Sequence, residues 1–250
     1  MTDILLYLAA FLAGFVDSVV GGGGLIQQPS LFIAYPDFPP AVIFGTNKFA
    51  MVWATAVASW MYLRKVSIDR KKLAVWFVFS GVFSFIGAGC VRLVNPELFK
   101  PVIFFVMLGI ALFTFFKKDI KHDSTSSSPD LKKGILISSA IGFYDGFIGP
   151  GTGTLLVFLF SAYAGAELLV ASCIAKVVNL SSNLFALANF ISMGTVIYSL
   201  ALPLLVFNSL GAVVGSRLAI SKGSAFIKTL LKVVIIMVLL RFGWDIFSTN

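Results

Sequence analysis

The chain has 250 residues, of which 58% are hydrophobic and only 12% are charged, and its mean hydropathy is +0.97. A soluble domain of this length could not bury so much apolar surface, so the composition predicts an integral membrane protein. The net charge of +8 would indicate nucleic-acid binding in a soluble protein, but here the basic residues gather in short segments between apolar runs. That distribution follows the positive-inside rule of membrane proteins, and we expect no nucleic-acid partner.

The chain begins with two apolar runs, 4–20 and 25–35, that glycines separate. Together they cover about 30 residues, or ~45 Å of helix at about 1.5 Å per residue. This length is too great for one straight membrane span and too small for two. A re-entrant helical hairpin is one solution and a span broken midway is the other, since irregular backbone needs protein or a water-filled cavity around it. The pair 134–148 and 152–163 repeats the pattern.

Six further apolar runs have about the 20 residues that a helix needs to cross a bilayer. They are 41–63, 73–94, 98–116, 168–190, 196–216 and 229–247. The loops 64–72, 117–133 and 217–228 are basic, whereas the loop 191–195 carries no charge. The basic loops all lie on one side of the membrane only if each pair of glycine-separated apolar runs turns back on itself. The positive-inside rule therefore favours re-entrant hairpins, with both chain termini outside.

An internal duplication relates the two halves of the chain. Asp17 and Asp145 lie 128 positions apart, and the same offset pairs Lys48 with Lys176. An odd number of crossings in each copy would invert the second relative to the first, and inverted repeats are a common transporter design. We expect two membrane repeats joined by a polar cytoplasmic linker, with boundaries at 1–118, 119–133 and 134–250.

Two glycine-rich regions carry a resemblance to a known family. The first is Gly14-Phe15-Val16-Asp17 with the glycine run after it, accompanied by Gly45-Thr46-Asn47-Lys48. The second is Gly142-Phe143-Tyr144-Asp145-Gly146, followed by Gly149-Pro150-Gly151-Thr152-Gly153. With these motifs the chain resembles the sulfite exporter TauE/SafE family, also called the toluene sulfonate uptake permease family, over nearly its whole length. The resemblance implies a bacterial inner-membrane protein that moves small anions, often sulfite, sulfonates or other sulfur-containing organic anions.

Lys48 and Lys176 each lie several residues inside a predicted span. A buried ammonium group is costly unless it faces a cavity or pairs with an anion, so contact with an anionic substrate is the first interpretation. Buried ion pairs of Lys48 with Asp17 and of Lys176 with Asp145 are the second. Snorkelling of the side chains to the membrane interface is the third.

The glycine clusters allow two interpretations as well. At a hairpin tip, the amides that begin the second leg present N–H donors and the positive end of a helix dipole, which would suit an oxyanion. The residues concerned are Gly22, Gly23, Gly24, Gly151, Thr152 and Gly153. Close packing between membrane helices explains the same glycines.

Neutral donors and the two aspartates complete the predicted site. Thr46, Asn47 and Asn179 stand near the lysines in the sequence. Each could bond an oxyanion or cross-link two helices. Asp17 and Asp145 could bind and release a proton during transport, or they could cap amides of the adjoining glycine turn.

The sequence thus predicts an all-α, polytopic membrane protein that acts as a secondary transporter of small anions by alternating access, with proton coupling as an option. An anion channel built on the same repeats is the alternative. An enzyme is disfavoured, and no catalytic residue, cofactor or metal site is expected, because no Ser/His/Asp set, zinc spacing or cofactor motif is present. The expected partners are a small anion and the lipid bilayer. Glycines such as Gly81, Gly87 and Gly89 can pack internally or between the protomers of a homo-oligomer.

Overall fold

The computed structural model describes residues 3–94 and 129–222, together with isolated positions at 101, 102, 104–106, 108, 109, 112, 236, 240 and 244. Within this part of the chain the structure consists of helices and their connections, with no strand, which confirms the all-α prediction. The predicted spans 98–116 and 229–247 lie outside the described residues, apart from the isolated positions.

The helix boundaries repeat along the chain. In order, the elements are α1 (Asp3–Val20), α2 (Gly24–Ala34), α3 (Pro40–Leu63), α4 (Arg70–Cys90), the short 3-10 helix η1 (Val91–Leu93), α6 (Leu131–Phe147), α7 (Thr152–Ala162), α8 (Leu168–Ser192) and α9 (Tyr198–Lys222). The helices α6, α7, α8 and α9 begin 128 positions after α1, α2, α3 and α4, respectively. The offset seen in the sequence motifs therefore extends to the starts of the helices.

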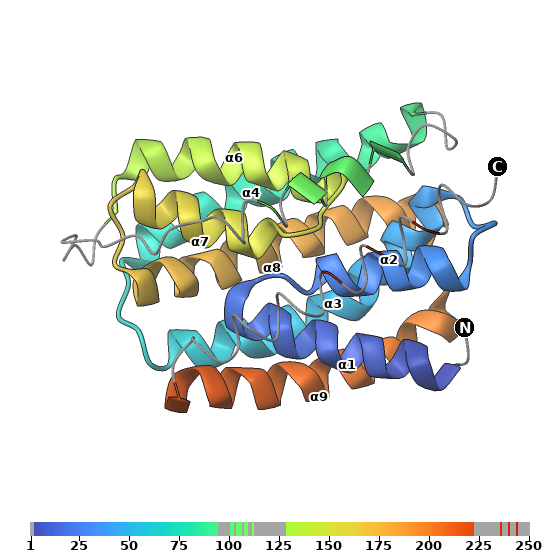
Figure 1. Cartoon of the computed structure of the whole chain (residues 1–250). Coiled ribbons are helices and arrows are strands. Elements are labelled where there is room, and N and C mark those ends of the chain that lie inside the picture. Colours follow the sequence, from blue (N-terminus) through green and yellow to red (C-terminus); the bar gives the residue numbers. More distant parts are fainter. Residues whose placement is uncertain are drawn as a thin grey trace.

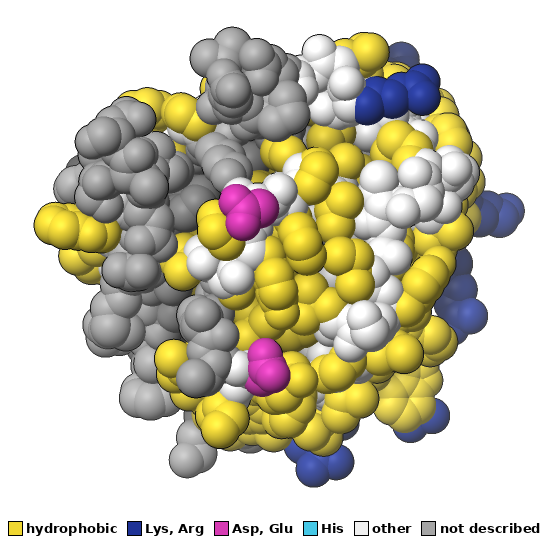
Figure 2. All heavy atoms as spheres, turned by 90° about the vertical axis from the view of Figure 1, so that its right-hand side faces the viewer, with side chains coloured by type: hydrophobic (Ala, Val, Ile, Leu, Met, Phe, Trp, Pro, Cys, Tyr) yellow, Lys and Arg dark blue, Asp and Glu magenta, His cyan; other side chains and the backbone are white. Residues whose placement is uncertain are grey.

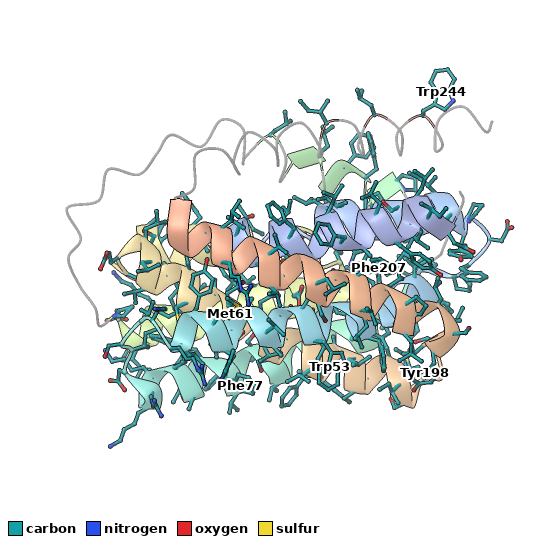
Figure 3. All side chains as sticks on the ribbon, turned by 90° about the horizontal axis from the view of Figure 1, so that it is seen from below. Trp53, Met61, Phe77, Tyr198, Phe207 and Trp244 are labelled. Atoms are coloured by element: carbon teal, nitrogen blue, oxygen red, sulfur yellow. The ribbon has the colours of Figure 1, made fainter. Side chains whose placement is uncertain are left out.

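Four of these helical segments are long and apolar enough to cross a membrane: Pro40–Leu63, Arg70–Leu93, Leu168–Ser192 and Tyr198–Ala219. They coincide with four of the six predicted spans. Large side chains on their outer faces, such as Trp53 and Tyr198, are about half exposed and point away from the bundle (Figure 3). Apolar outer faces of this kind suit contact with lipid, and the chain is a multi-pass membrane protein.

Each short pair of helices forms a hairpin. α1 packs against α2 across the turn at 21–23, and α6 packs against α7 across the turn at 148–151. Gly21, Gly149 and Gly151 have φ angles of 80°, 92° and 78°, which glycine adopts without a steric penalty. In Figure 1 the α1–α2 hairpin enters the bundle from the end that holds the N-terminus, and the α6–α7 hairpin enters from the opposite end.

The two halves of the chain exchange helices instead of packing as separate lobes. α1 lies against α9, the equivalent helix α6 lies against α4, and α3 lies against α8. Glycines permit the first two contacts: a Cβ atom at Gly14 would overlap the carbonyl of Asn208, and one at Gly142 would overlap the carbonyl of Ser80. Close helix packing is thus the role of these two glycines.

Gly81 and Gly87 are two of the glycines that could lie at an interface between protomers. In the structure they pack against other helices of the same chain. Gly81 lies against Ser181 and Phe185 of α8, and Gly87 lies against Phe143 of α6. Their small size is explained by these contacts between helices of one chain, so they supply no argument for a protomer interface.

Basic side chains gather at one end of the bundle. They follow α3, begin α4 and occupy the first turn of α6, at Arg64, Lys65, Arg70, Lys71, Lys72, Lys132 and Lys133. Figure 1 places these three helix ends together, opposite the N-terminus. Figure 2 shows the N-terminal end, whose described surface is mostly hydrophobic, with some acidic side chains and with Lys and Arg only toward its margin. A hairpin topology under the positive-inside rule requires this asymmetry.

An aspartate sets the start of α6. Asp130 accepts a hydrogen bond from the amide of Lys133 at 2.8 Å, a side-chain cap that begins the helix at Leu131. The helix therefore starts inside the range 119–133 that the sequence assigns to the linker. The linker before Pro129 lies outside the described residues.

Candidate functional site

The tips of the two hairpins meet in the middle of the bundle and enclose a small polar cavity. The amide of Thr154 donates to the carbonyl of Gly21 at 3.2 Å, and the side-chain amide of Gln28 donates to the carbonyl of Ile148 at 3.1 Å. We call the space between the tips the central cavity. The volume that the centre of a water molecule can occupy in this cavity is about 20 Å³. This volume holds one or two water molecules.

Most of the sequence-predicted site residues lie on the wall of the central cavity. They are Asp17, Gly24, Asn47, Lys48, Asp145, Gly151, Thr152, Gly153 and Asn179. The remaining four, Thr46, Lys176, Gly22 and Gly23, are not on that wall. Thr46 accepts a hydrogen bond from the amide of Ile197 at 3.2 Å, so its hydroxyl links two segments of the bundle.

Gln28 and Asn183 are wall residues that the predicted site left out. Both are neutral polar residues in apolar segments, which the sequence allows to bond an oxyanion or to cross-link helices. Asn183 has a further signal, because it follows Lys176 by seven residues, two turns of the same helix, with Asn179 between them. These three residues form a polar stripe on one face of α8. Gln28 carried no comparable signal, because its neighbour Gln27 is equally polar and lies off the wall.

Lys48 and Asp145 form a tight, buried ion pair. The Nζ atom of Lys48 lies 2.6 Å from Oδ2 of Asp145 and 2.8 Å from Oδ1 of Asn183. The hydroxyl of Thr152 lies 2.7 Å from the other carboxylate oxygen of Asp145 and 2.6 Å from the carbonyl oxygen of Gly149, and its single proton serves these two acceptors. Because moving two ions out of water costs several kcal/mol for each, a buried pair is tolerated only with such additional hydrogen bonds.

Lys176 and Asp17, the equivalent residues of the duplication, make a looser contact. The ammonium of Lys176 donates to the main-chain carbonyl of Asp17, and its distance to Oδ2 of that carboxylate is 3.9 Å. Oδ1 of Asp17 accepts a long hydrogen bond of 3.4 Å from the amide of Gly23. Oδ2 has no hydrogen-bond partner among the described residues. One oxygen of a buried carboxylate is therefore left unsatisfied.

Both ion pairs join one half of the chain to the other, which corrects the pairing inferred from the sequence. That interpretation paired Lys48 with Asp17, and Lys176 with Asp145. It was wrong because the lysine helices α3 and α8 lie side by side, so each lysine reaches the hairpin of the opposite half. Thr55 and Asn183, which are equivalent positions of the duplication, share a hydrogen bond of 3.4 Å where the two helices meet.

The two aspartates also differ in the capping role that the sequence allowed them. Asp17 accepts from the amide of Gly23 in the adjoining turn, as a cap would. Asp145 directs its two oxygens to the side chains of Lys48 and Thr152. Only the first hairpin thus uses its aspartate to satisfy a glycine amide among the contacts that the structure describes.

The amides at the hairpin tips are partly engaged in hydrogen bonds within and between the hairpins. The amide of Thr152 donates to the carbonyl of Gly149 at 3.3 Å, and that of Thr154 donates to Gly21. α2 and α7 nevertheless begin at the central cavity, with Gly24 and Thr152 on its wall. The positive ends of two helix dipoles therefore point to the same small space.

Relatives of the chain are described as membrane transporters. It is 31% identical over 244 residues to a "Probable membrane transporter protein" of Haemophilus influenzae, covering 96% of this chain and 94% of the relative. It is 34% identical over 237 residues to "Probable membrane transporter protein ORF9" of Sinorhizobium sp, covering 94% and 90%. It is also 34% identical over 233 residues to "Probable membrane transporter protein YfcA" of Escherichia coli strain K12, covering 92% and 85%.

No solved structure matches the chain. Residues 6–242 match the family described as "Sulfite exporter TauE/SafE". This match spans both hairpins, both buried lysines and the central cavity between them. The chain belongs to the sulfite exporter TauE/SafE family of membrane transporters.

Proposed function

We propose that this protein is a secondary transporter of a small anion, either sulfite, a sulfonate or a related sulfur-containing organic anion. The observation that carries the proposal is the ammonium of Lys48 on the wall of a central cavity, between two broken helical hairpins. Ionisable groups buried among membrane-spanning helices mark the paths of substrates and ions. Anionic substrates of transporters commonly bind at the starts of half-helices, and α2 and α7 begin at this cavity.

Transport would proceed by alternating access between two inverted repeats. The hairpins approach from opposite ends of the bundle and touch through Thr154 and Gly21, and residues of both hairpins line the central cavity. The cavity is too small for a sulfonate group, and an anion could enter only after one hairpin moves away from the other. An arriving oxyanion would then replace Oδ2 of Asp145 as an acceptor for Lys48.

We place the protein in the bacterial inner membrane, with the basic end of the bundle in the cytoplasm and both termini outside. The support is the clustering of Arg64, Lys65 and the other basic side chains at one end. In this assignment the protein is a carrier and has no catalytic activity.

Flux measurements in proteoliposomes test the proposal. Vesicles that contain the wild-type protein are expected to take up labelled sulfite, sulfate or ethanesulfonate with saturation kinetics. The Lys48→Met protein should lose this flux, whereas Lys65→Met, which alters an exposed lysine just beyond the same helix, should keep it. Full flux in correctly inserted Lys48→Met protein would refute the role of the lysine, and flux that rises without saturation would favour an anion channel.

A further inference from the structure

Three side-chain oxygens of central-cavity residues have no hydrogen-bond partner within the described part of the chain. They are Oδ2 of Asp17, Oε1 of Gln28 and Oδ1 of Asn47. These residues are only 3%, 1% and 3% exposed. A buried polar atom without a partner is destabilising, so three such acceptors around one cavity point to a ligand that supplies donors or positive charge.

For two of the three oxygens, the acceptor character does not depend on how the side-chain amides are oriented. The Nε2 atom of Gln28 donates to the carbonyl of Ile148 at 3.1 Å, which leaves Oε1 as the free atom of that side chain. An ionised carboxylate can only accept hydrogen bonds. Two of the three oxygens, those of Asp17 and Gln28, are thus acceptors in either orientation of Asn47.

Charge and helix direction favour a cation at Asp17. Of the two carboxylates on the wall, Asp145 is 2.6 Å from Lys48, whereas Asp17 is 3.9 Å from Lys176, which lies off the wall. Asp17 also occupies the last turn of α1, and the C-terminal end of a helix attracts positive charge. Asp17 is therefore the less compensated carboxylate of the central cavity.

We propose that Asp17, Gln28 and Asn47 bind a monovalent cation, either sodium or a proton, that travels with the anion. This inference rests on the proposed function and supplies its coupling ion. The buried charges of Lys48, Lys176, Asp17 and Asp145 sum to zero, so an anion bound alone would leave a net negative charge in a low-dielectric interior. A cation bound with the anion restores neutrality and offsets that penalty.

The charged and titratable groups around Asp17 come from few elements. Lys48 and Tyr62 of α3 and Lys176 of α8 interact electrostatically with Asp17. Asp145 of α6 lies on the same wall, and α2 and α7 contain no titratable side chain. Helix α9 packs along α1 and contributes the titratable or charged side chains of Tyr198 and Arg217. A proton taken up by Asp17 would be held among these groups.

Sodium binding is tested on the purified full-length protein without any anionic substrate. The melting temperature is measured in choline chloride and during replacement of choline by sodium. Wild type is expected to gain stability saturably, and Gln28→Met and Asn47→Ala should abolish the gain. Gln27→Met is the matched control, because Gln27 is the buried neighbour on the same helix, bonds Asn208 at 2.6 Å and lies off the cavity wall. It should keep the sodium response.

Proton coupling is tested in proteoliposomes that enclose a pH-sensitive dye. Ethanesulfonate is the probe, because it is the anion of a strong acid and carries no proton itself. If the cation is a proton, inward ethanesulfonate movement acidifies the lumen in wild type, and Asp17→Asn abolishes the acidification. Should Asp17→Asn fail to fold, Gln28→Met serves in its place and is expected to slow the proton flux several-fold, with Gln27→Met again as the control.

The outcomes separate this inference from the proposed function. A sodium response or a proton flux that disappears in the wall variants and persists in Gln27→Met supports the cation site. Saturable ethanesulfonate or sulfate flux that is independent of both sodium and pH refutes the cation site and leaves anion transport standing. An ion response that survives both Asp17→Asn and Gln28→Met also refutes it. A lack of any anion flux, with sodium stabilisation intact, refutes the proposed function and the coupling to it, and leaves cation binding standing.

Discussion

Lys48 and Lys176 occupy equivalent positions of the duplication, yet their surroundings differ. Lys48 lies on the wall of the central cavity and holds a carboxylate and an amide oxygen at 2.6 and 2.8 Å. Lys176 lies off the wall, donates to a main-chain carbonyl and is 3.9 Å from the nearest oxygen of the Asp17 carboxylate. Lys48 and Asp145 satisfy each other directly, whereas the contact of Lys176 with Asp17 leaves one carboxylate oxygen without a donor in the part of the chain that the structure describes.

The difference arises from the neutral neighbours and not from the charges. Thr152 donates to Asp145, but the equivalent position in the first half is Gly24, which has no side chain. Asn183 accepts from Lys48, but its equivalent, Thr55, donates its hydroxyl to the carbonyl of Met51 at 2.8 Å. The two copies kept all four charges and diverged in the groups that satisfy them. Two ion pairs formed by equivalent charged residues are therefore not equivalent in structure.

Removing each lysine gives the largest expected contrast. Lys48→Met leaves Asp145 as a buried charge without its cation, and we expect a loss of about 3–5 kcal/mol in the free energy of unfolding. Lys176→Met removes a weaker contact and should cost about 1–3 kcal/mol. Unfolding in detergent measures both losses. Equal losses would contradict the difference between the two pairs.

A double-mutant cycle sharpens the same contrast. The coupling free energy between Lys48→Met and Asp145→Leu is expected to reach about 2–3 kcal/mol, because the two groups are in direct contact. The cycle for Lys176→Met and Asp17→Leu should give about 0.5 kcal/mol or less, as for weakly interacting sites. A larger coupling in the second cycle would show that Lys176 and Asp17 approach each other more closely than in this structure.

Thr152→Val isolates the contribution of one neutral neighbour. The substitution keeps the shape of the side chain and removes a hydroxyl that lies 2.7 Å from Asp145 and 2.6 Å from the carbonyl of Gly149. We expect a loss of about 2 kcal/mol in the free energy of unfolding, typical of a hydrogen bond to a charged group. Thr55→Val is the counterpart in the first half and should cost about 1 kcal/mol or less, since its hydroxyl donates within its own helix and accepts only a long bond of 3.4 Å from Asn183. Thermal unfolding of the two variants side by side provides the measurement.

Glycine substitutions test the places where the two halves are alike. Gly14→Ala and Gly142→Ala each push a methyl group into the backbone of a neighbouring helix, and each should lower stability by about 1 kcal/mol or more. Gly89→Ala is the control, because its nearest neighbour is a side-chain atom of Asn189 at 3.4 Å; its effect should stay within about 0.5 kcal/mol. Markedly unequal losses at Gly14 and Gly142 would limit the structural equivalence of the halves.

Much of the fold could be predicted, because its causes are local in the sequence. Hydropathy located the four helical spans that the structure describes, and the glycines at 21–24 and 149–153 located both hairpin tips. Lys48 and Asp145 could be assigned to the site because charges inside apolar segments are rare and need partners. The start of α6 was placed less precisely, since the cap by Asp130 begins the helix at Leu131, before the apolar run predicted to begin at 134.

The partners within the site could not be predicted, because they depend on how the helices cross. Pairing Lys48 with Asp17 and pairing it with Asp145 are equally compatible with the sequence, and only the contact between α3 and α8 decides between them. The sequence also could not predict that Lys176 lies off the wall of the central cavity. Its acceptor is a main-chain carbonyl, and every residue carries one, so no sequence pattern marks it.

The crossing of the ion pairs has a consequence for the biogenesis of the protein. Lys48 is synthesised 97 residues before Asp145, the carboxylate that it contacts in the finished molecule. Until the α6–α7 hairpin has been inserted, the N-terminal half holds a lysine and an aspartate that both lack their final charged partners. Completion of the core is therefore tied to the late steps of translation, and a nascent chain stopped at the linker would remain a substrate for insertion factors and quality-control proteases.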